Sequence, residues 1–214
     1  MLIAGRSLWV TETNCYVIAG GRGSAAVIID APPEADAVIG LLKEYDLSAA
    51  ALLLTHGHVD HVGGAHTVAA RTGAVVHVHP DDDFLTLDPA TQMRSLFGLV
   101  PPGDWSAPPD RIDLVDSAVL HIGEVVLQVR HTPGHTPGHC CFYSEQEGVL
   151  FSGDQLFARS VGRTDLPGGS WEQLLASMRE KVLDLPDEVR VLPGHGPETA
   201  IGTERRQNPF LRGL

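Results

Sequence analysis

The stretch LLLTHGHVDHVGG, residues 52–64, decides how the rest of the chain is interpreted. An apolar run ends at Leu54, and three histidines and one aspartate follow between positions 56 and 61. A continuous apolar run is typical of a strand that is covered on both faces. Ligands of α/β folds gather just past the carboxyl ends of such strands. The stretch therefore favours a metal site at a strand end over a polar loop that is merely rich in histidine.

Three later loops carry candidate ligands in the same position relative to an apolar strand. His135 follows EVVLQVRHTPG, Asp154 follows GVLFSG, and His195 follows EVRVLPG. Glycine and proline flank nearly all of these side chains, and they allow tight turns and close approach of the backbone to a site. We therefore expect the loops to meet. The candidate metal ligands are His56, His58, Asp60, His61, His135, Asp154 and His195.

Seven ligands are too many for one four-coordinate ion, so the set divides into two. His56 and His58 are two residues apart in an extended loop and can face the same way. We assign these two side chains to one ion together with His135.

The second ion receives the remaining ligands. Asp60 and His61 are adjacent at a predicted helix start and diverge from the first pair, so we assign them to the second ion with His195. Asp154 is left to bridge, with one carboxylate oxygen on each ion. Imidazoles with a few carboxylates suit Zn²⁺, Fe or Mn rather than Ca²⁺ or Mg²⁺, and Zn²⁺ is the ion we expect.

The chain as a whole predicts two rounds of strands followed by helices within a single domain, residues 1–214. Two packed sheets with helices outside would bury every apolar run. Residues 80–117 contain six prolines and predict a long irregular flap, with only a brief helical stretch at 91–97. The predicted strands are 7–10, 15–20, 25–30, 50–55, 74–79, 118–123, 124–132, 139–145, 148–153 and 188–194, and the predicted helices are 33–45, 63–73, 171–183 and 198–207.

Composition excludes some partners. The net charge is -12 and only 15 residues are basic, without a cluster, which argues against nucleic acid as a partner. No run approaches the roughly 18 apolar residues of a membrane span, and the start of the chain lacks the pattern of a signal peptide. We therefore expect a cytoplasmic protein without a membrane partner, whose three cysteines are buried apolar residues.

The motifs resemble a known family. THGHVDH, residues 55–61, matches the H-x-H-x-D-H signature of the metallo-β-lactamase fold superfamily. Four further stretches, in the same order, resemble the glyoxalase II-like hydrolases of that superfamily: HTPGHTPGH (131–139), FSGDQLF (151–157), VGRTDLPGG (161–169) and LPGHGPETAIGTERRQNPFL (192–211). Full glyoxalase II enzymes carry a further helical domain that contacts glutathione, so this sequence resembles the shorter, single-domain members.

The resemblance implies a fold and a reaction. The fold is α/β, a four-layer αββα sandwich with two divalent metal ions at one edge of the sheets, and the ligands divide between the ions as above. Metal-bound hydroxide attacks the acyl carbon of a thioester, such as S-lactoylglutathione or another low-molecular-weight thiol ester. Asp60 is the expected catalytic residue, since it can orient the hydroxide. We expect Asp30 and Thr55 to support the ligands, and Arg163 either to pair with Asp165 or to contact the substrate.

Other functions remain open. Persulfide dioxygenases share the fold and the GRTD segment but use a single iron, and PGHGPET (193–199) fits the hydrolases better. Lactone hydrolysis, phosphodiester cleavage and a non-enzymatic metal-binding module are further alternatives. The sequence leaves open the acyl group, the thiol, the metal and the oligomeric state.

Overall fold

The computed structural model describes residues 1–214 and contains two six-stranded sheets. The first sheet has the order β1-β2-β3-β4-β5-β6; β1 to β3 run antiparallel, and β3 to β6 run parallel. Its strands are β1 (Leu2–Leu8), β2 (Thr13–Ala19), β3 (Ala25–Ile29), β4 (Ser48–Leu53), β5 (Val75–Val78) and β6 (Arg111–Asp113).

The second sheet has the order β14-β13-β10-β9-β8-β7, and only β10 and β13 pair in parallel. Its strands are β7 (Val119–Ile122), β8 (Val125–His131), β9 (Cys140–Ser144), β10 (Val149–Gly153), β13 (Arg190–Pro193) and β14 (Thr199–Ala200). A small hairpin of β11 (Leu156–Phe157) and β12 (Ser160–Val161) stands apart from both sheets.

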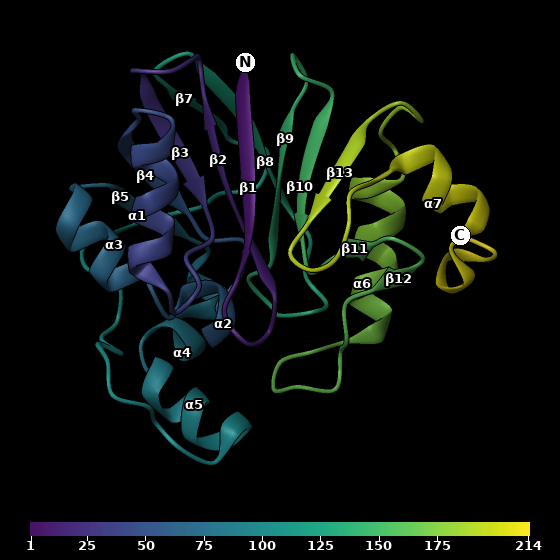
Figure 1. The fold of residues 1–214 in the computed structure, drawn as a ribbon. Helices are drawn as coiled ribbons and strands as arrows, with labels where there is room; N and C mark the ends of the chain where they lie inside the picture. The colour runs from purple at the N-terminus through teal and green to yellow at the C-terminus, as the bar shows by residue number, and fades with distance from the viewer.

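Helices cover the outer faces of the two sheets, as Figure 1 shows. On one side lie α1 (Ala35–Glu44) and α3 (Ala65–Thr72), and on the other lie α6 (Trp171–Ser177), its π-helical continuation Met178–Val182, and α7 (Ile201–Gln207). Each interface has its own apolar core: one between the two sheets, which includes Phe142 and Phe151, and one under each helix layer. The four layers confirm the predicted αββα sandwich.

A third group of helices lies at one end of the sandwich, at the bottom of Figure 1. These are α2 (Val59–Val62), α4 (Asp83–Thr86) and α5 (Pro89–Phe97), with a 3₁₀ turn at Pro80–Asp82; a second 3₁₀ turn, Pro209–Leu211, follows α7. Both α4 and α5 pack against α2, which follows the histidine loop at the end of β4.

The segment 80–117 is more regular than its six prolines suggested. Residues 80–97 are mostly helical, and β6 extends the first sheet. Prolines occupy first-turn positions of the 3₁₀ turn and of α5, where the missing N–H costs nothing, and Asp88 caps α5 by accepting from Thr91 N. Residues 87–88, 98–110 and 114–117 lack regular structure, and the helical stretch expected at 91–97 is part of α5. The expectation of an irregular segment was therefore wrong only for 80–86, 89–90 and 111–113.

The first strand begins earlier than predicted, at Leu2 instead of Ser7. In its register, Gly5 lies opposite Tyr16 and its missing side chain leaves room for the tyrosine ring. None of the helices has the length and hydrophobicity that crossing a bilayer requires.

Candidate metal centre

Three histidines converge in a buried cluster at the end of the sandwich. His56 and His58 lie in the loop after β4, and His135 lies in the loop between β8 and β9. His56 Nε2 is 3.2 Å from His135 Nε2, and His58 Nδ1 is 2.8 Å from the same atom. We call these three side chains the first cluster; the structure brings them together as the sequence predicted.

A second cluster lies beside the first. Asp60 and His61 belong to α2, and His195 follows β13. His195 Nε2 is 3.3 Å from His61 Nε2 and 3.3 Å from Asp60 Oδ2. Thr13 Oγ1 donates to Asp60 Oδ2 at 3.0 Å and fixes the carboxylate.

Asp154 lies between the two clusters. Its Oδ2 is 3.6 Å from His135 Nε2 and 3.5 Å from His195 Nε2, and its Oδ1 is 3.4 Å from His61 Nε2. Oδ1 is buried and has no hydrogen-bond partner. The carboxylate therefore reaches both clusters, but a single oxygen, Oδ2, faces one histidine of each, whereas we expected one oxygen per ion.

The outer nitrogens of the first cluster determine what its inner nitrogens can do. His135 Nδ1 lies 2.7 Å from the carbonyl oxygen of Arg163, which can only accept, so Nδ1 carries the hydrogen. Thr55 Oγ1 donates to Asp30 Oδ2 and therefore accepts from His56 Nδ1. His135 Nε2 and His56 Nε2 are thus both bare lone pairs that face each other.

The second cluster has the same arrangement. His61 Nδ1 donates to Asp30 Oδ2 at 2.8 Å, and His195 Nδ1 donates to the carbonyl oxygen of Thr11 at 3.1 Å. In the neutral form of both rings, which metal binding requires, two bare Nε2 atoms again face each other across 3.3 Å. Lone pairs repel unless a cation lies between them. A tetrahedral ion about 2.1 Å from two ligands separates them by about 3.4 Å, so these side chains fit two metal ions.

The protonation state of the histidines in the first cluster also suits metal binding. Burial lowers the pKa of His58 to about 3, with a contribution from neighbouring His135, and burial lowers the pKa of His135 to about 4. Burial likewise holds the pKa of His56 well below its usual value. These rings are neutral near pH 7, the form in which imidazole binds a metal.

Charges dominate the second cluster. Burial opposes the charged form of His61, but the carboxylates of Asp60, Asp154 and Asp30 outweigh it and raise the pKa of His61 to about 10. Burial would raise the pKa of Asp60, yet nearby His61 and His195 hold it well below its ordinary value. The carboxylate of Asp60 is therefore ionised, and the carboxylates that favour a proton on His61 would equally favour a second cation that replaces this proton.

Asp30 and Thr55 occupy the supporting positions that the sequence suggested. Asp30 accepts from Thr55 N, Thr55 Oγ1 and His61 Nδ1. Its backbone is in the left-handed region, with φ 60°, an unfavourable conformation for a residue with a side chain. The three hydrogen bonds compensate for that strain and place its carboxylate behind both clusters.

Sequence reasoning missed Asp82, which it treated as part of an irregular segment. The buried carboxylate accepts from Gly57 N at 2.7 Å, Thr136 Oγ1 at 2.7 Å and Gly138 N at 2.6 Å. Burial raises the pKa of Asp82, although these hydrogen bonds oppose the shift. Asp82 thus joins the two loops that carry the first cluster.

Gln92 of α5 was missed as well. It donates to Gly57 O and Leu85 O and accepts from Val59 N, so it ties the histidine loop to the neighbouring helices. A buried glutamine in a helix has no local sequence signal, because its partners lie up to 35 residues away.

Gly194 provides the close approach that the flanking glycines suggested. A β-carbon at this position would collide with Asp154 Oδ1 and come within 2.8 Å of His61 Cε1. The absence of a side chain here therefore lets the β13 loop reach the second cluster.

Other candidate residues lie outside the two clusters. Arg163 forms a two-pronged ion pair with Asp165, both exposed, so substrate contact by Arg163 stays a prediction. His139 accepts from Asp154 N and bonds Thr132 Oγ1, a positioning role. His131 donates to a backbone carbonyl.

His79, Asp81 and His131 form one more group that is close enough to share an ion. The two imidazole rings stack at 4.0 Å with only 10° between their planes. In-plane lone pairs of stacked rings cannot converge on one ion, so we assign no metal there.

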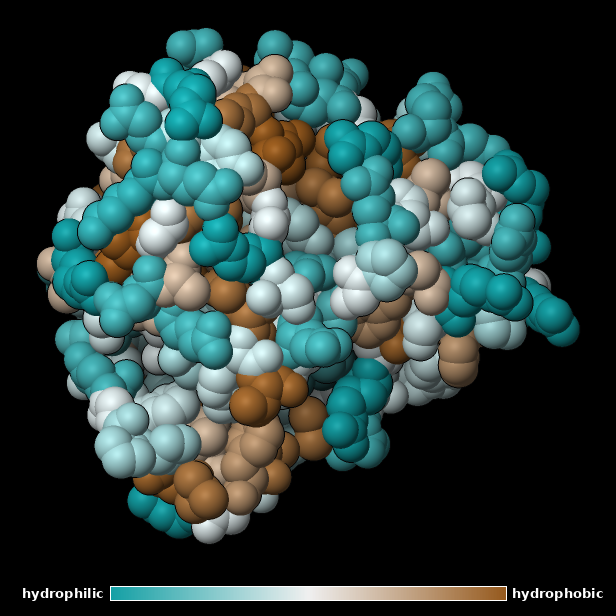
Figure 2. All heavy atoms as spheres, viewed as in Figure 1, coloured by the Kyte–Doolittle hydropathy of each residue, from teal (hydrophilic) through white to brown (hydrophobic).

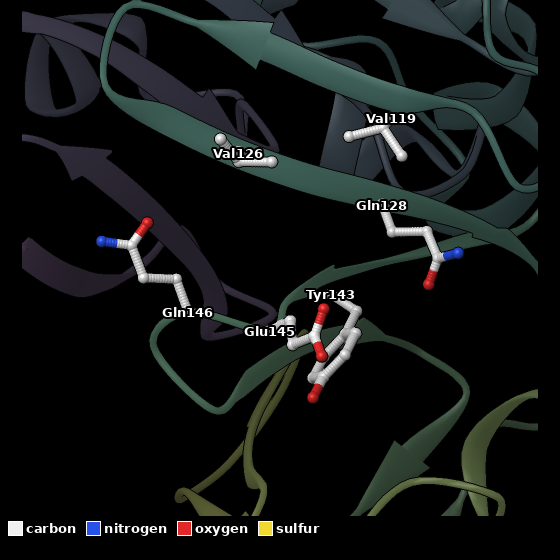
Figure 3. Close-up of a pocket in the computed structure, with 6 residues that line it drawn as sticks. All are labelled: Val119, Val126, Gln128, Tyr143, Glu145 and Gln146. Atoms are coloured by element: carbon white, nitrogen blue, oxygen red, sulfur yellow. The ribbon is translucent and has the colours of Figure 1, made fainter.

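A hollow of about 390 Å³ lies elsewhere, on the outer face of β7, β8 and β9. Figure 3 shows its lining side chains, among them Gln128, Tyr143 and Glu145. The residues of β8 that line the hollow alternate with those that face the core between the sheets, and none of the candidate ligands lines it, so we do not place the reaction there.

The four-layer sandwich and the histidine-rich sheet edge together define a class of metal-binding α/β proteins. The chain belongs to the Metallo-beta-lactamase superfamily, whose sequence model matches residues 8–195.

The similarity to known proteins covers nearly the whole chain. A protein of Mycobacterium leprae, ML0493, is 42% identical over 100% of both chains, and Hydroxyacylglutathione hydrolase GloC of Haemophilus influenzae is 38% identical over 94% of this chain and 93% of that protein. Among solved structures, BLEG-1 B3 metallo-beta-lactamase has a TM-score of 0.92 at 40% identity, covering 99% of this chain and 100% of its own. TTHA1623 in a di-iron-bound form has a TM-score of 0.86 at 38% identity, covering 97% and 100%.

Proposed function

We propose that this protein is a dinuclear-metal hydrolase of low-molecular-weight thioesters, similar to glyoxalase II. The observation that carries the proposal is the pair of facing imidazole lone pairs, His56 with His135 and His61 with His195, with Asp154 between them. We propose the six side chains of the two clusters and Asp154 as ligands, and Zn²⁺ as the ion, with Fe or Mn as alternatives, since TTHA1623 was solved in a di-iron-bound form.

Two divalent ions bound there would supply a hydroxide near neutral pH and polarise the acyl carbonyl. The residues of the chain position these groups. Thr13 donates to Asp60 Oδ2, which leaves Oδ1 free to accept a hydrogen bond from the nucleophile and orient it. Asp30 orients His61 directly, and His56 through Thr55, with Nδ1 as the donor and Nε2 toward the cluster. A thiolate leaves readily, so the site needs no strong general acid.

The names of two relatives support hydrolysis. One is Hydroxyacylglutathione hydrolase GloC, and a Bacillus subtilis protein, 37% identical, is called Probable metallo-hydrolase YqgX. The similarity to BLEG-1 B3 metallo-beta-lactamase favours β-lactam hydrolysis as a second candidate, since the same nucleophile could open an amide ring.

The test combines metal analysis with a substrate screen. We expect two metal ions per chain and faster turnover of S-lactoylglutathione or another thioester than of lactones, phosphodiesters or β-lactams. Asp60→Asn and His58→Ala should abolish turnover in folded protein, whereas His121→Ala, an exposed histidine of β7, should not. One iron per chain with oxygen uptake on a glutathione persulfide would instead identify a persulfide dioxygenase, and metal binding without turnover would identify a non-enzymatic module.

A further inference from the structure

A cavity of about 260 Å³ adjoins the first cluster. It lies between the α4–α5 segment and the loop after β12, and its walls include His58, Phe84, Leu85, Leu96 and Leu166. Because His58 Nδ1 faces His135 in the cluster, one imidazole ring separates the cavity from the candidate metal centre. A part of the substrate that extends from the metal centre past His58 therefore enters this cavity.

Two of the polar side chains of the cavity already have hydrogen-bond partners, and apart from His58 the hydroxyl groups of Thr91 and Ser95 are the other polar groups. Gln92 makes three hydrogen bonds to the backbone of its own surroundings, and Asp88 caps α5 through Thr91 N. No lysine or arginine lines the cavity. A ligand group here meets mainly hydrocarbon and finds no cation for a carboxylate.

The rim of the cavity is apolar as well. Phe84 is 53% exposed and Leu96 is 46% exposed, and Leu87, Phe97 and Leu99 are exposed on the same segment. Figure 2 shows this apolar surface at the end of the molecule where α4 and α5 lie. Exposed apolar side chains that continue into a pocket are typical of a ligand site, because a monomer otherwise gains by covering them.

We infer that this cavity binds the acyl group of the substrate, and that the enzyme prefers straight aliphatic acyl chains longer than acetyl. The inference rests on the proposed thioester hydrolysis and deepens it. The volume is below the roughly 300 Å³ at which pockets begin to hold a whole drug-sized ligand, so it takes one arm of the substrate. The acyl arm fits this cavity because it is uncharged, whereas the thiol arm of glutathione carries two carboxylates.

The main test is an acyl series on one neutral thiol. Acetyl, butanoyl and hexanoyl thioesters of N-acetylcysteamine are compared with the zinc-loaded protein. We expect kcat/KM to rise by about fourfold per added methylene, the value for full burial of each methylene, until the cavity is full. Leu96→Ser and Leu166→Ser should flatten this dependence, and Val115→Ser, at an exposed apolar residue outside both the cavity and its rim, should leave it unchanged. A flat series in active enzyme overturns the inference.

A binding experiment separates failure of the cavity from failure of the proposed reaction. The hexyl thioether of N-acetylcysteamine, which cannot be hydrolysed, is titrated into the zinc-loaded protein while the leucine methyl signals are recorded by NMR. We expect shifts at Leu85, Leu96 and Leu166. If no thioester is hydrolysed, these shifts still support an aliphatic site and the proposed reaction alone is wrong. Absence of shifts at these leucines overturns the acyl site, whether or not the protein is a thioesterase.

Discussion

Replacing Asp82 by alanine tests whether this residue joins the two loops of the first cluster. The change removes hydrogen bonds to Gly57 N, Thr136 Oγ1 and Gly138 N, all between 2.6 and 2.7 Å. At ~1–1.5 kcal/mol for each bond, the free energy of unfolding should fall by about 3–5 kcal/mol. Because the loops also hold the first cluster, the affinity of one metal ion should fall by about 10–100-fold, as for other residues that support ligands.

The assays are urea unfolding and chelator competition on zinc-loaded protein. Asp81→Ala is the matched control, since Asp81 is exposed and its carboxylate makes only a 3.7 Å contact with His79. Asp82→Asn should be intermediate, because the amide keeps one acceptor oxygen but directs N–H groups at donors. If Asp82→Ala matched Asp81→Ala in both assays, the loops would be held by other contacts and our account of the first cluster would be wrong.

Three other changes test the remaining parts of the site. Asp30→Ala should weaken the binding of both metal ions, because its carboxylate lies behind both clusters. Loss of only one ion in metal analysis would contradict this. Gly194→Ala should lower metal content and turnover, since the new β-carbon meets Asp154. Gly40→Ala is the control: it lies in α1 with open space around it and should raise the free energy of unfolding by ~0.5–1 kcal/mol. Equal metal content in the two variants would argue against the close approach at Gly194. Removal of both metal ions should lower Tm by on the order of 10–20 °C, because each ion stabilises the fold by ~2.7 kcal/mol when its concentration is a hundredfold above Kd. Addition of Zn²⁺ but not of Mg²⁺ should restore Tm. An unchanged Tm would refute metal binding at the clusters.

The sequence predicted the sandwich and its ligand loops because both depend on local patterns. Apolar runs such as 50–55 identify buried strands, and the candidate ligands directly follow such runs. In α/β folds, ligand-binding residues follow the carboxyl ends of strands, which lie at a common edge of the sheet. The positions of His56, His135 and His195 just after apolar runs were therefore enough to predict that they meet. The grouping into two clusters followed from the spacing within the histidine loop. The structure contains both groups, and it also brings His56 of the first close to His61 of the second and to Asp154.

The parts that the sequence did not predict depend on contacts between distant residues. Asp82 is 54 residues from Thr136, and Thr13 is 47 residues from Asp60. The prolines of residues 80–89 were taken as evidence against helices, although proline is favourable in a first helical turn. The edge strand β1 includes Gly5 and Arg6, and it forms because β2 supplies its partner rather than because its own residues favour a strand.

Asp30 explains why the two clusters, which share the histidine loop, form a single site. One of its oxygens, Oδ2, accepts both from Thr55 Oγ1, which orients His56 of the first cluster, and from His61 Nδ1 of the second. One carboxylate therefore fixes the bare nitrogens that face both proposed ions, and its left-handed backbone is a cost that the fold sustains only with these bonds formed. Asp154 couples the clusters from the opposite side through Oδ2. Because the clusters share these two carboxylates, the two ions should bind as a coupled pair, and no variant of either carboxylate should affect one ion alone.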